Sequence, residues 1–396
     1  MDSSITPFKI SISDAEISSL KSKLSASIFP DEVDFSNNWD YGTPLNDMQR
    51  LAKYWRDGFD WRAQEKILNE MPQFTTKIEV DGFGELDIHF VHQKSEEGSI
   101  PLLFCHGWPG SFIEVKKIIS LLTKSGNGQS FHVVAPSLPG FGFSDAPKKA
   151  GFGIPQYAET VHKLMLKLGY NKYASQGGDW GWSITRMLGV KYPTHCVASH
   201  INFIITSLPQ LDEFIKNMSQ PLTPQEEEGV ARTRWFFTEG VGYNILQCTK
   251  PNTLAFALRD SPLALLSWIY EKLHEWTDSY PWTDDEILTW ISIYQFSKAG
   301  PGASVMIYYH GTHLYQEEGK KLSEYVEGVK LGLSYFPKDL CLPPSVYGRG
   351  LGEVVFERRH GEGGHFAAYE KPELLVGDLK EMFRVDGGVG GLLSKI

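Results

Sequence analysis

The chain has 396 residues, of which 41% are hydrophobic and 22% are charged, an ordinary composition for a globular protein. Its formal net charge of −10 argues against nucleic-acid or anionic-membrane partners, because both require a basic protein surface. The four cysteines are scattered without a CxxC pair, and neither a signal-peptide pattern nor a long apolar run occurs. We therefore expect a cytoplasmic protein without a membrane span or a disulfide framework.

Residues 1–95 are expected to form an N-terminal domain of helices followed by a β-hairpin. Asp14 is a candidate N-cap for a helix over residues 15–28, and one amphipathic helical run covers residues 45–71. Residues 77–94 have β-type composition around an Asp-Gly turn, which predicts the hairpin.

Short apolar strands alternate with helices over residues 96–205, which predicts a parallel sheet with helices on both faces. Strands are expected at 101–105, 131–136, 171–176 and 196–203, and helices at 111–125, 154–170 and 181–193.

Residues 206–325 interrupt this alternation, because they are helical in pattern and rich in Trp and Tyr. The alternation returns over residues 326–396, with two strand-like runs and a terminal helix. The whole pattern predicts a mostly parallel eight-stranded sheet flanked by helices, into which a helical lid is inserted.

The run QGGDWG, residues 176–181, lies between a predicted strand and a predicted helix. Small residues two positions before and after a central residue permit a sharp turn that presents a nucleophile, usually Ser and here Asp179. An Asp at a helix start is more often only an N-cap. The strand and the flanking glycines favour a nucleophile, and the positive end of the helix would keep its carboxylate ionised.

A nucleophile needs a base, and α/β hydrolases carry nucleophile, acid and His in that chain order. His365 lies in GGHF between a predicted strand and the last helix, and Asp339 follows another strand in FPKDL. Either residue alone would be an ordinary loop residue. The order Asp179, Asp339, His365 favours a catalytic set.

The loop after the 101–105 strand reads His106-Gly107-Trp108-Pro109. In the α/β-hydrolase fold this loop supplies one backbone N–H of the oxyanion hole, which here would be that of Trp108. The residue after the nucleophile, here Trp180, supplies the other. A tight turn made by Gly and Pro is the structural alternative, and both descriptions can hold together.

Five separated motifs, HGWPG, SLPGFGFS, GGDWG, FPKDL and GGHFAAYE, together resemble the microsomal-type epoxide hydrolases, including soluble fungal members. The resemblance covers nearly the whole chain, including the N-terminal region. It implies an epoxide hydrolase that forms a covalent ester on Asp179, which His365 and Asp339 then hydrolyse. It implies no metal or organic cofactor, and the short HFVH and HGTH pairs lack a third ligand nearby.

The resemblance also implies two lid tyrosines that hydrogen-bond the epoxide oxygen. Tyr243 matches one of them, and Tyr308 matches the other, with the adjacent Tyr309 as the alternative. One residue rotates a helical side chain by about 100°, so only one of the two should face the cleft. The substrate contacts that we expect are made by His106, Trp108, Trp180 and Phe366.

The substrates expected are aromatic epoxides and water, with detoxification as the role and hormone turnover or biosynthesis as alternatives. A haloalkane or haloacid dehalogenase is the nearest alternative, because it shares the Asp nucleophile and because the Trp180 indole could bind halide. A ligand-binding protein without turnover is a third reading, which an intact catalytic set disfavours.

The chain ends Ser394-Lys395-Ile396 after a Gly-rich stretch, one conservative step from a peroxisomal address. A frayed terminus is the plainer reading, so cytoplasmic location is expected and peroxisomal import is the alternative. The N-terminal region could clasp the lid or a neighbouring subunit, which keeps a homodimer open.

Overall fold

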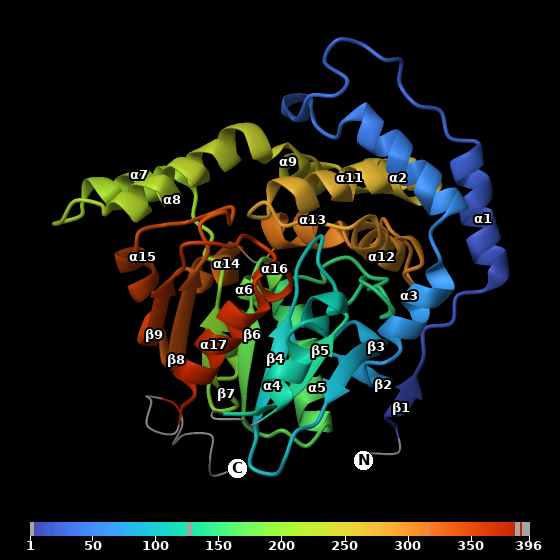
Figure 1. Ribbon diagram of the computed structural model, residues 1–396. Coiled ribbons are helices and arrows are strands. Elements are labelled where there is room, and N and C mark those ends of the chain that lie inside the picture. The colour runs from blue at the N-terminus through green and yellow to red at the C-terminus, as the bar shows by residue number, and fades with distance from the viewer. Residues whose placement is uncertain (1–3, 125–128, 315, 385–388, 390–396) are drawn as a thin grey trace.

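A mixed sheet of nine strands lies at the centre of the computed structural model, which describes residues 4–124, 129–314, 316–384 and 389 (Figure 1). In chain order the strands are β1 (Thr6–Phe8), β2 (Gln73–Val80), β3 (Gly84–Gln93), β4 (Ile100–Cys105), β5 (Phe131–Pro136), β6 (Tyr173–Gly177), β7 (Cys196–Ile201), β8 (Val326–Tyr335) and β9 (Gly352–Arg359). Their order across the sheet is β1-β2-β3-β5-β4-β6-β7-β8-β9. The pairs from β1 to β5 are antiparallel, and those from β5 to β9 are parallel. The predicted mostly parallel sheet is confirmed, and the strand beyond the expected eight is β1, which pairs with β2 at the edge.

The sheet centre is covered on both faces, so β4 and β6 are buried along their whole length. Helices α5 (Ile154–Lys167) and α6 (Trp180–Lys191) pack together on one face, and α4 (Ile119–Thr123) and α17 (Pro372–Met382) pack together on the other (Figure 1). Because β4, β6, β8 and β9 run parallel, the loops after them meet at one edge of the sheet.

Helices between Ser207 and Ser323 lie over that edge (Figure 1). They are α7 (Leu208–Lys216), α8 (Pro224–Trp235), η3 (Phe236–Gly240), α9 (Gly242–Thr249), α10 (Pro251–Asp260), α11 (Pro262–Glu275), α12 (Asp284–Gln295), α13 (Met306–His313) and α14 (Gln316–Leu322). Helix α12 is bonded to the loop after β4, because Trp290 Nε1 donates to the Pro109 carbonyl at 2.6 Å. This lid therefore rests directly on the residues that follow the central strands.

The N-terminal helices pack on the lid of their own chain. They are α1 (Asp14–Ser25), α2 (Leu45–Asp57) and α3 (Trp61–Leu68), with a short η1 (Trp39–Tyr41) between the first two. Trp55 Nε1 in α2 donates to Ser292 Oγ in α12 at 3.1 Å, and Lys23 Nζ donates to the Asp260 carbonyl at 2.8 Å. Of the two expected contacts of the N-terminal region, the one with the lid of its own chain is confirmed, and the homodimer stays a prediction.

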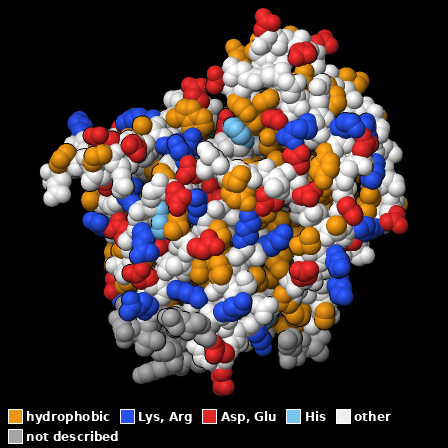
Figure 2. Space-filling view, viewed as in Figure 1, with side chains coloured by type: hydrophobic (Ala, Val, Ile, Leu, Met, Phe, Trp, Pro, Cys, Tyr) orange, Lys and Arg blue, Asp and Glu red, His pale blue; other side chains and the backbone are white. Residues whose placement is uncertain are grey.

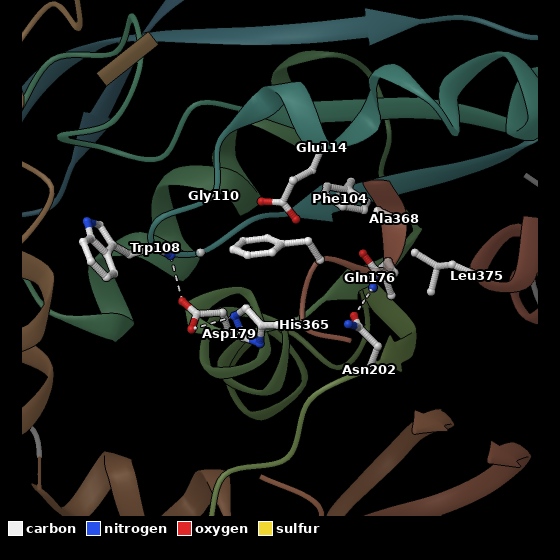
Figure 3. A pocket seen from close by; sticks show the side chains of 14 residues that line it. Phe104, Trp108, Gly110, Glu114, Gln176, Asp179, Asn202, His365, Ala368 and Leu375 are labelled. Atoms are coloured by element: carbon white, nitrogen blue, oxygen red, sulfur yellow. Dashed lines mark hydrogen bonds and ion pairs between the residues drawn. The ribbon is translucent and has the colours of Figure 1, made fainter. Parts of the chain in front are cut away.

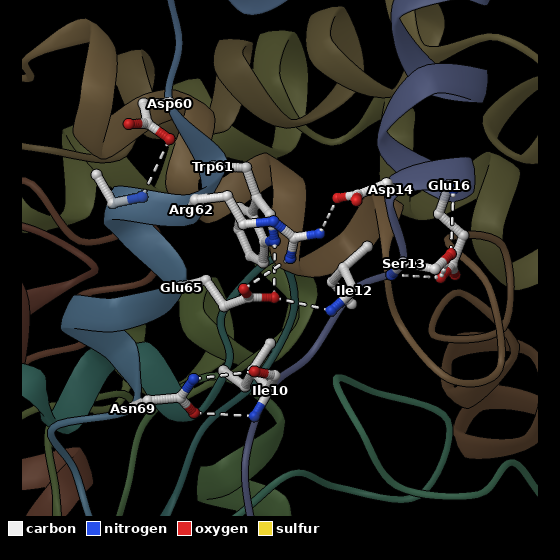
Figure 4. A network of polar contacts seen from close by, with 11 residues as sticks. Ile10, Ile12, Ser13, Asp14, Glu16, Asp60, Trp61, Arg62, Glu65 and Asn69 are labelled. Atoms are coloured by element: carbon white, nitrogen blue, oxygen red, sulfur yellow. Dashed lines mark hydrogen bonds and ion pairs between the residues drawn. The ribbon is translucent and has the colours of Figure 1, made fainter.

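A buried carboxylate fixes the start of the chain to α3 (Figure 4). Glu65 accepts hydrogen bonds from the Ile12 N–H at 2.7 Å, Trp61 Nε1 at 3.2 Å and Arg62 Nη1 at 2.7 Å. The segment leading into α1 is thus tied down before the helix begins. The N-cap of α1 is Ser13 and not Asp14, because the Ser13 hydroxyl accepts from the Glu16 N–H and Glu16 bonds back in a capping box.

Two predicted helices are divided in the structure. The run over residues 45–71 breaks before Asp60, whose side chain caps α3 by accepting from the Ala63 N–H at 3.1 Å. The run over residues 111–125 begins as a 3₁₀ helix, η2 (Phe112–Lys116), because the Ser111 hydroxyl accepts from the Ile113 N–H and tightens the first turn. Two further short helices, α15 (Ser345–Arg349) and α16 (Ala367–Glu370), follow β8 and β9.

The surface shown in Figure 2 carries acidic and basic side chains intermixed, with scattered apolar groups between them. Such a mixed surface sets up no field of a single sign over this face. Across the described ranges, no helix has both the length and the apolar character needed to cross a bilayer.

Candidate active site

Asp179 lies at the turn between β6 and α6, with φ 49° and ψ −129°. This positive φ is uncommon for a residue other than Gly, and strained positions of this kind gather at functional sites. Although Asp179 occupies the N-cap position of α6, its side chain makes no capping hydrogen bond. The carboxylate is therefore not used to cap the helix. This arrangement fits a nucleophile and does not fit a residue that serves only as an N-cap.

The turn closes tightly because two glycines allow backbone contact. A Cβ on Gly181 would lie 2.0 Å from the Cys105 carbonyl oxygen, and a Cβ on Gly107 would lie 2.1 Å from Asp179 Oδ1. The Trp108 N–H donates to that same Oδ1 at 2.8 Å (Figure 3). The β4 loop thus places a backbone donor on the Asp179 carboxylate, while Trp180 N–H, the second expected donor, stays a prediction.

His365 joins the two acids that the sequence singled out. Its Nδ1 donates to Asp339 Oδ1 at 2.6 Å, and its Nε2 lies 3.4 Å from Asp179 Oδ2. An isolated parallel bridge between Lys338 and Gly364 holds the β8 and β9 loops together. Lid and core also meet here, because the His365 N–H donates to the Trp276 carbonyl at 2.8 Å.

The charge state of His365 depends on its neighbours. Burial opposes the imidazolium, but the negative charges of Asp339 and Asp179 and hydrogen bonds with both outweigh it and raise the pKa of His365 to about 10. His365 is therefore protonated at neutral pH. Removing the charge of Asp179 would lower this pKa and make Nε2 available as a base.

Two lid tyrosines face Asp179 from α9 and α13. Tyr243 and Tyr308 are buried, with ring centroids 6.0 Å apart, and Tyr308 packs edge-on against Trp180 at 4.9 Å. Burial first, and then the charge of Asp179, raise the pKa of Tyr243 well above its usual value, so this phenol keeps its proton. Burial does the same for Tyr308, whose ring packs against those of Tyr243 and Trp180. Tyr309 instead is 38% exposed and stacks on His313, so it points away from the site.

Asp179 and the tyrosines border a cavity of about 190 Å³ between the core and the lid. Most of its walls are apolar or aromatic, contributed by Trp180, Trp182, Phe203, Ile205, Phe236, Phe237, Val241 and Leu340. A cavity with apolar walls and a few convergent polar groups is typical of a small-molecule site.

The other expected substrate contacts divide into two groups. Trp180 lines the large cavity, while Trp108 and Phe366 line a second, smaller space behind Asp179. His106 borders neither cavity: its Nδ1 donates to the Gly107 carbonyl at 2.9 Å, and its Nε2 accepts from the Leu138 N–H at 3.2 Å. Burial lowers the pKa of His106 to about 4, so the neutral ring supports the β4 loop instead of contacting substrate.

Four residues at the site escaped the sequence analysis. Glu114, Gln176 and Asn202 line the smaller space, and the Trp276 ring packs 5.0 Å from that of His365. Two signals in the sequence could have identified two of them: Gln176 belongs to the QGGDWG motif, and Glu114 interrupts an apolar run. Over the described part of the chain, no three His, Cys, Asp or Glu side chains are grouped so as to hold a metal ion.

Two family models and several known proteins match this chain. Residues 5–115 match the family model described as epoxide hydrolase N terminus, and residues 100–218 match that of the alpha/beta hydrolase fold. The chain is 34% identical to Epoxide hydrolase 1 of Sus scrofa, covering 96% of this chain and 88% of that protein. It is 33% identical to Juvenile hormone epoxide hydrolase 1 of Ctenocephalides felis, covering 96% of this chain and 85% of the other.

A solved structure agrees with these sequence matches. The Aspergillus niger epoxide hydrolase superposes with a TM-score of 0.83 at 36% identity, covering 94% of each chain. Both the helical N-terminal part and the sheet are included at this coverage. The chain belongs to the epoxide hydrolase family.

Proposed function

We propose that this protein converts epoxides and water to vicinal diols through a covalent ester on Asp179. One observation supports this most: a carboxylate bonded to the Trp108 N–H faces two buried phenols on one side and His365 on the other. A phenol that keeps its proton can assist departure of the epoxide oxygen, which is a poor leaving group without such help.

In the first step, the epoxide lies in the large cavity and Asp179 Oδ2 attacks one of its ring carbons. The ring C–O bond breaks, its electron pair stays on the oxygen, and a proton from Tyr243 or Tyr308 neutralises that oxygen. General-acid help of this kind typically contributes about 10²–10⁴-fold. The product is a hydroxyalkyl ester of Asp179, with Oδ1 still bonded to the Trp108 N–H.

In the second step, His365 Nε2 takes a proton from water, and the oxygen of that water bonds to the Asp179 carbonyl carbon. Asp339 holds the imidazolium that forms. The negative charge on Oδ1 faces the Trp108 N–H, and one such donor is worth about 2.7–4 kcal/mol in the barrier. The bond from this carbon to Oδ2 then breaks, and the diol leaves with a proton from His365. The second water proton, left on the Asp179 carboxyl group, is released to solvent, and the phenolate takes up a proton from solvent.

The apolar, aromatic walls of the large cavity support aryl or alkyl epoxides as substrates. Styrene oxide is a suitable probe in a single turnover in ¹⁸O-water. We expect ¹⁸O in the Asp179 peptide and an unlabelled diol, because water oxygen stays on the enzyme. Label in the diol alone would contradict an ester intermediate, and halide release from a haloalkane of similar size would favour the dehalogenase alternative.

The lid tyrosines give a prediction with an internal control. Tyr243→Phe and Tyr308→Phe should each slow ester formation by about 10–100-fold and together nearly stop it, because each phenol donates to the departing oxygen. Ester hydrolysis should change little in the single variants. Rapid-quench measurement of the ester checks this, with Tyr309→Phe as the matched control on the same helix. A damaging Tyr309→Phe and a silent Tyr308→Phe would reverse the assignment.

We further infer a cytoplasmic location. The four cysteines are free thiols and three of them are buried, as is usual in a reducing compartment. The Ser394–Ile396 segment lies outside the described residues, so peroxisomal import stays an alternative. A fluorescent protein extended by GGLLSKI would be diffuse in the first case and punctate in the second.

A further inference from the structure

Two separate spaces meet at Asp179. The large cavity of about 190 Å³ opens under the lid, and a small cavity of about 20 Å³ lies on the core side. Asp179 borders both, whereas His365 borders only the small one. A buried cavity must have a volume of roughly 10–15 Å³ to hold one water molecule, so the small cavity has room for one.

The small cavity is lined by polar groups that a water could bind. Gln176 Nε2 donates to Asn202 Oδ1 at 2.6 Å, which leaves Gln176 Oε1 buried and without a hydrogen-bond partner in the described structure. Figure 3 shows the Gln176 oxygen turned away from Asn202, toward the side on which Glu114 lies. A buried acceptor without a partner is costly, so it favours an occupant that donates a hydrogen bond.

Glu114 reaches the same cavity from η2. A Cβ on Gly110 would lie 1.9 Å from Glu114 Oε1, so the carboxyl group packs directly over this glycine. The Tyr294 hydroxyl of the lid fixes Gly110 by donating to its carbonyl at 2.6 Å. Burial first, and the charge of Asp179 in addition, raise the pKa of Glu114 to about 8, while the positive charge of His365 and a backbone hydrogen bond from Ser111 oppose the shift.

We propose that the small cavity holds the water that hydrolyses the Asp179 ester, and that Glu114 is a positioning residue for this water. This inference rests on the proposed function, because it concerns only the second step. The water oxygen faces the Asp179 carbonyl carbon, one hydrogen points to His365 Nε2, and the other is bound by Glu114 or Gln176. Attack then comes from the core side, while the alkyl part of the ester occupies the large cavity.

This arrangement explains how the two steps stay separate. The epoxide approaches Asp179 from the lid side, so a water on the core side need not be displaced when substrate binds. Transfer of one water proton to His365 and bonding of the oxygen to the carbonyl carbon use no further reactant. Glu114 neither gains nor loses a proton overall, and it acts by orienting the water.

The test is a single turnover with styrene oxide, in which ester formation and ester decay are followed separately by rapid quench and intact-protein mass. Glu114→Ala should leave ester formation near the wild-type rate and slow ester decay by about 10²-fold, since misplaced reacting groups commonly cost that much. Glu114→Gln should be milder, because its amide oxygen still accepts a hydrogen bond. Gly110→Ala should also slow decay, because its methyl group displaces the Glu114 carboxyl.

The matched control is Glu65→Gln, which alters a buried carboxylate of the N-terminal region that lines neither cavity. It should lower the melting temperature without changing either rate. The inference is overturned if the ester of Glu114→Ala decays at the wild-type rate, or if every Glu114 variant slows both steps equally. Should Glu114→Ala not fold, Glu114→Gln and Gly110→Ala decide by the same criteria. Absence of any ester in His365→Gln would instead contradict the proposed function.

Discussion

Asp179→Asn is expected to abolish epoxide turnover, with a fall in kcat of about 10⁴-fold or more, as for loss of other enzymatic nucleophiles. The amide keeps the size of the carboxylate and can still accept from the Trp108 N–H, so the fold should survive. It carries no negative charge with which to attack a strained carbon. Diol formation from styrene oxide, measured on a preparation whose mass confirms the Asn, checks this.

The matched control for this change is Asp378→Asn. Asp378 lies beside a histidine, as Asp179 does, and accepts from His360 Nε2 at 2.6 Å. It is buried on α17 and also accepts from Ser334 and Arg358. Its replacement should lower the melting temperature and spare the rate per folded molecule. Wild-type turnover by Asp179→Asn would exclude the covalent mechanism, and slow recovery with a mass gain of one unit would indicate deamidation to the active Asp.

The sequence predicted the parts of the site that depend on local order along the chain. The elbow around Asp179 follows from a strand, small flanking residues and a helix, all within a few positions. Asp339 and His365 were predicted from chain order, since the loops after parallel strands converge at one sheet edge. In these cases the fold itself brings the residues together.

Other features needed the tertiary structure. The motif favours Tyr308 and leaves Tyr309 as the alternative, and only the packing of α13 shows that the first is buried and the second 38% exposed. His106 is among the residues expected to contact substrate, yet both of its ring nitrogens bond to backbone groups. A motif thus locates a loop without saying which side chains face the cavity.

Glu114 is a residue that the sequence did not single out, although it lines the small cavity at Asp179. In sequence it is one acidic residue in an expected amphipathic helix, where a solvated position would be ordinary. The actual 3₁₀ turn of η2 directs it against Gly110 and into the small cavity. The capping of α1 by Ser13 instead of Asp14 has a simpler cause, because neighbouring Ser and Asp are both good caps and the reciprocal bond with Glu16 selects Ser13.

The proposed two-step reaction uses His365 differently in each step. In the free enzyme the charges of Asp339 and Asp179 outweigh burial, and the pKa of His365 is about 10. Ester formation removes the charge of Asp179, so this pKa falls and the neutral ring is more populated at neutral pH. The chemistry of the first step thereby prepares the base for the second.

His365→Gln should consequently form the ester and fail to hydrolyse it. A glutamine can still bond to Asp339 but cannot take a proton from water, so decay of the ester should slow by about 10²–10⁴-fold. Intact-protein mass should rise by the mass of the epoxide and stay raised, with the increment on the Asp179 peptide. His360→Gln is the matched control, because His360 also pairs with a buried Asp and lies outside both cavities at Asp179. Continued diol formation by His365→Gln without an adduct would show that another group is the base.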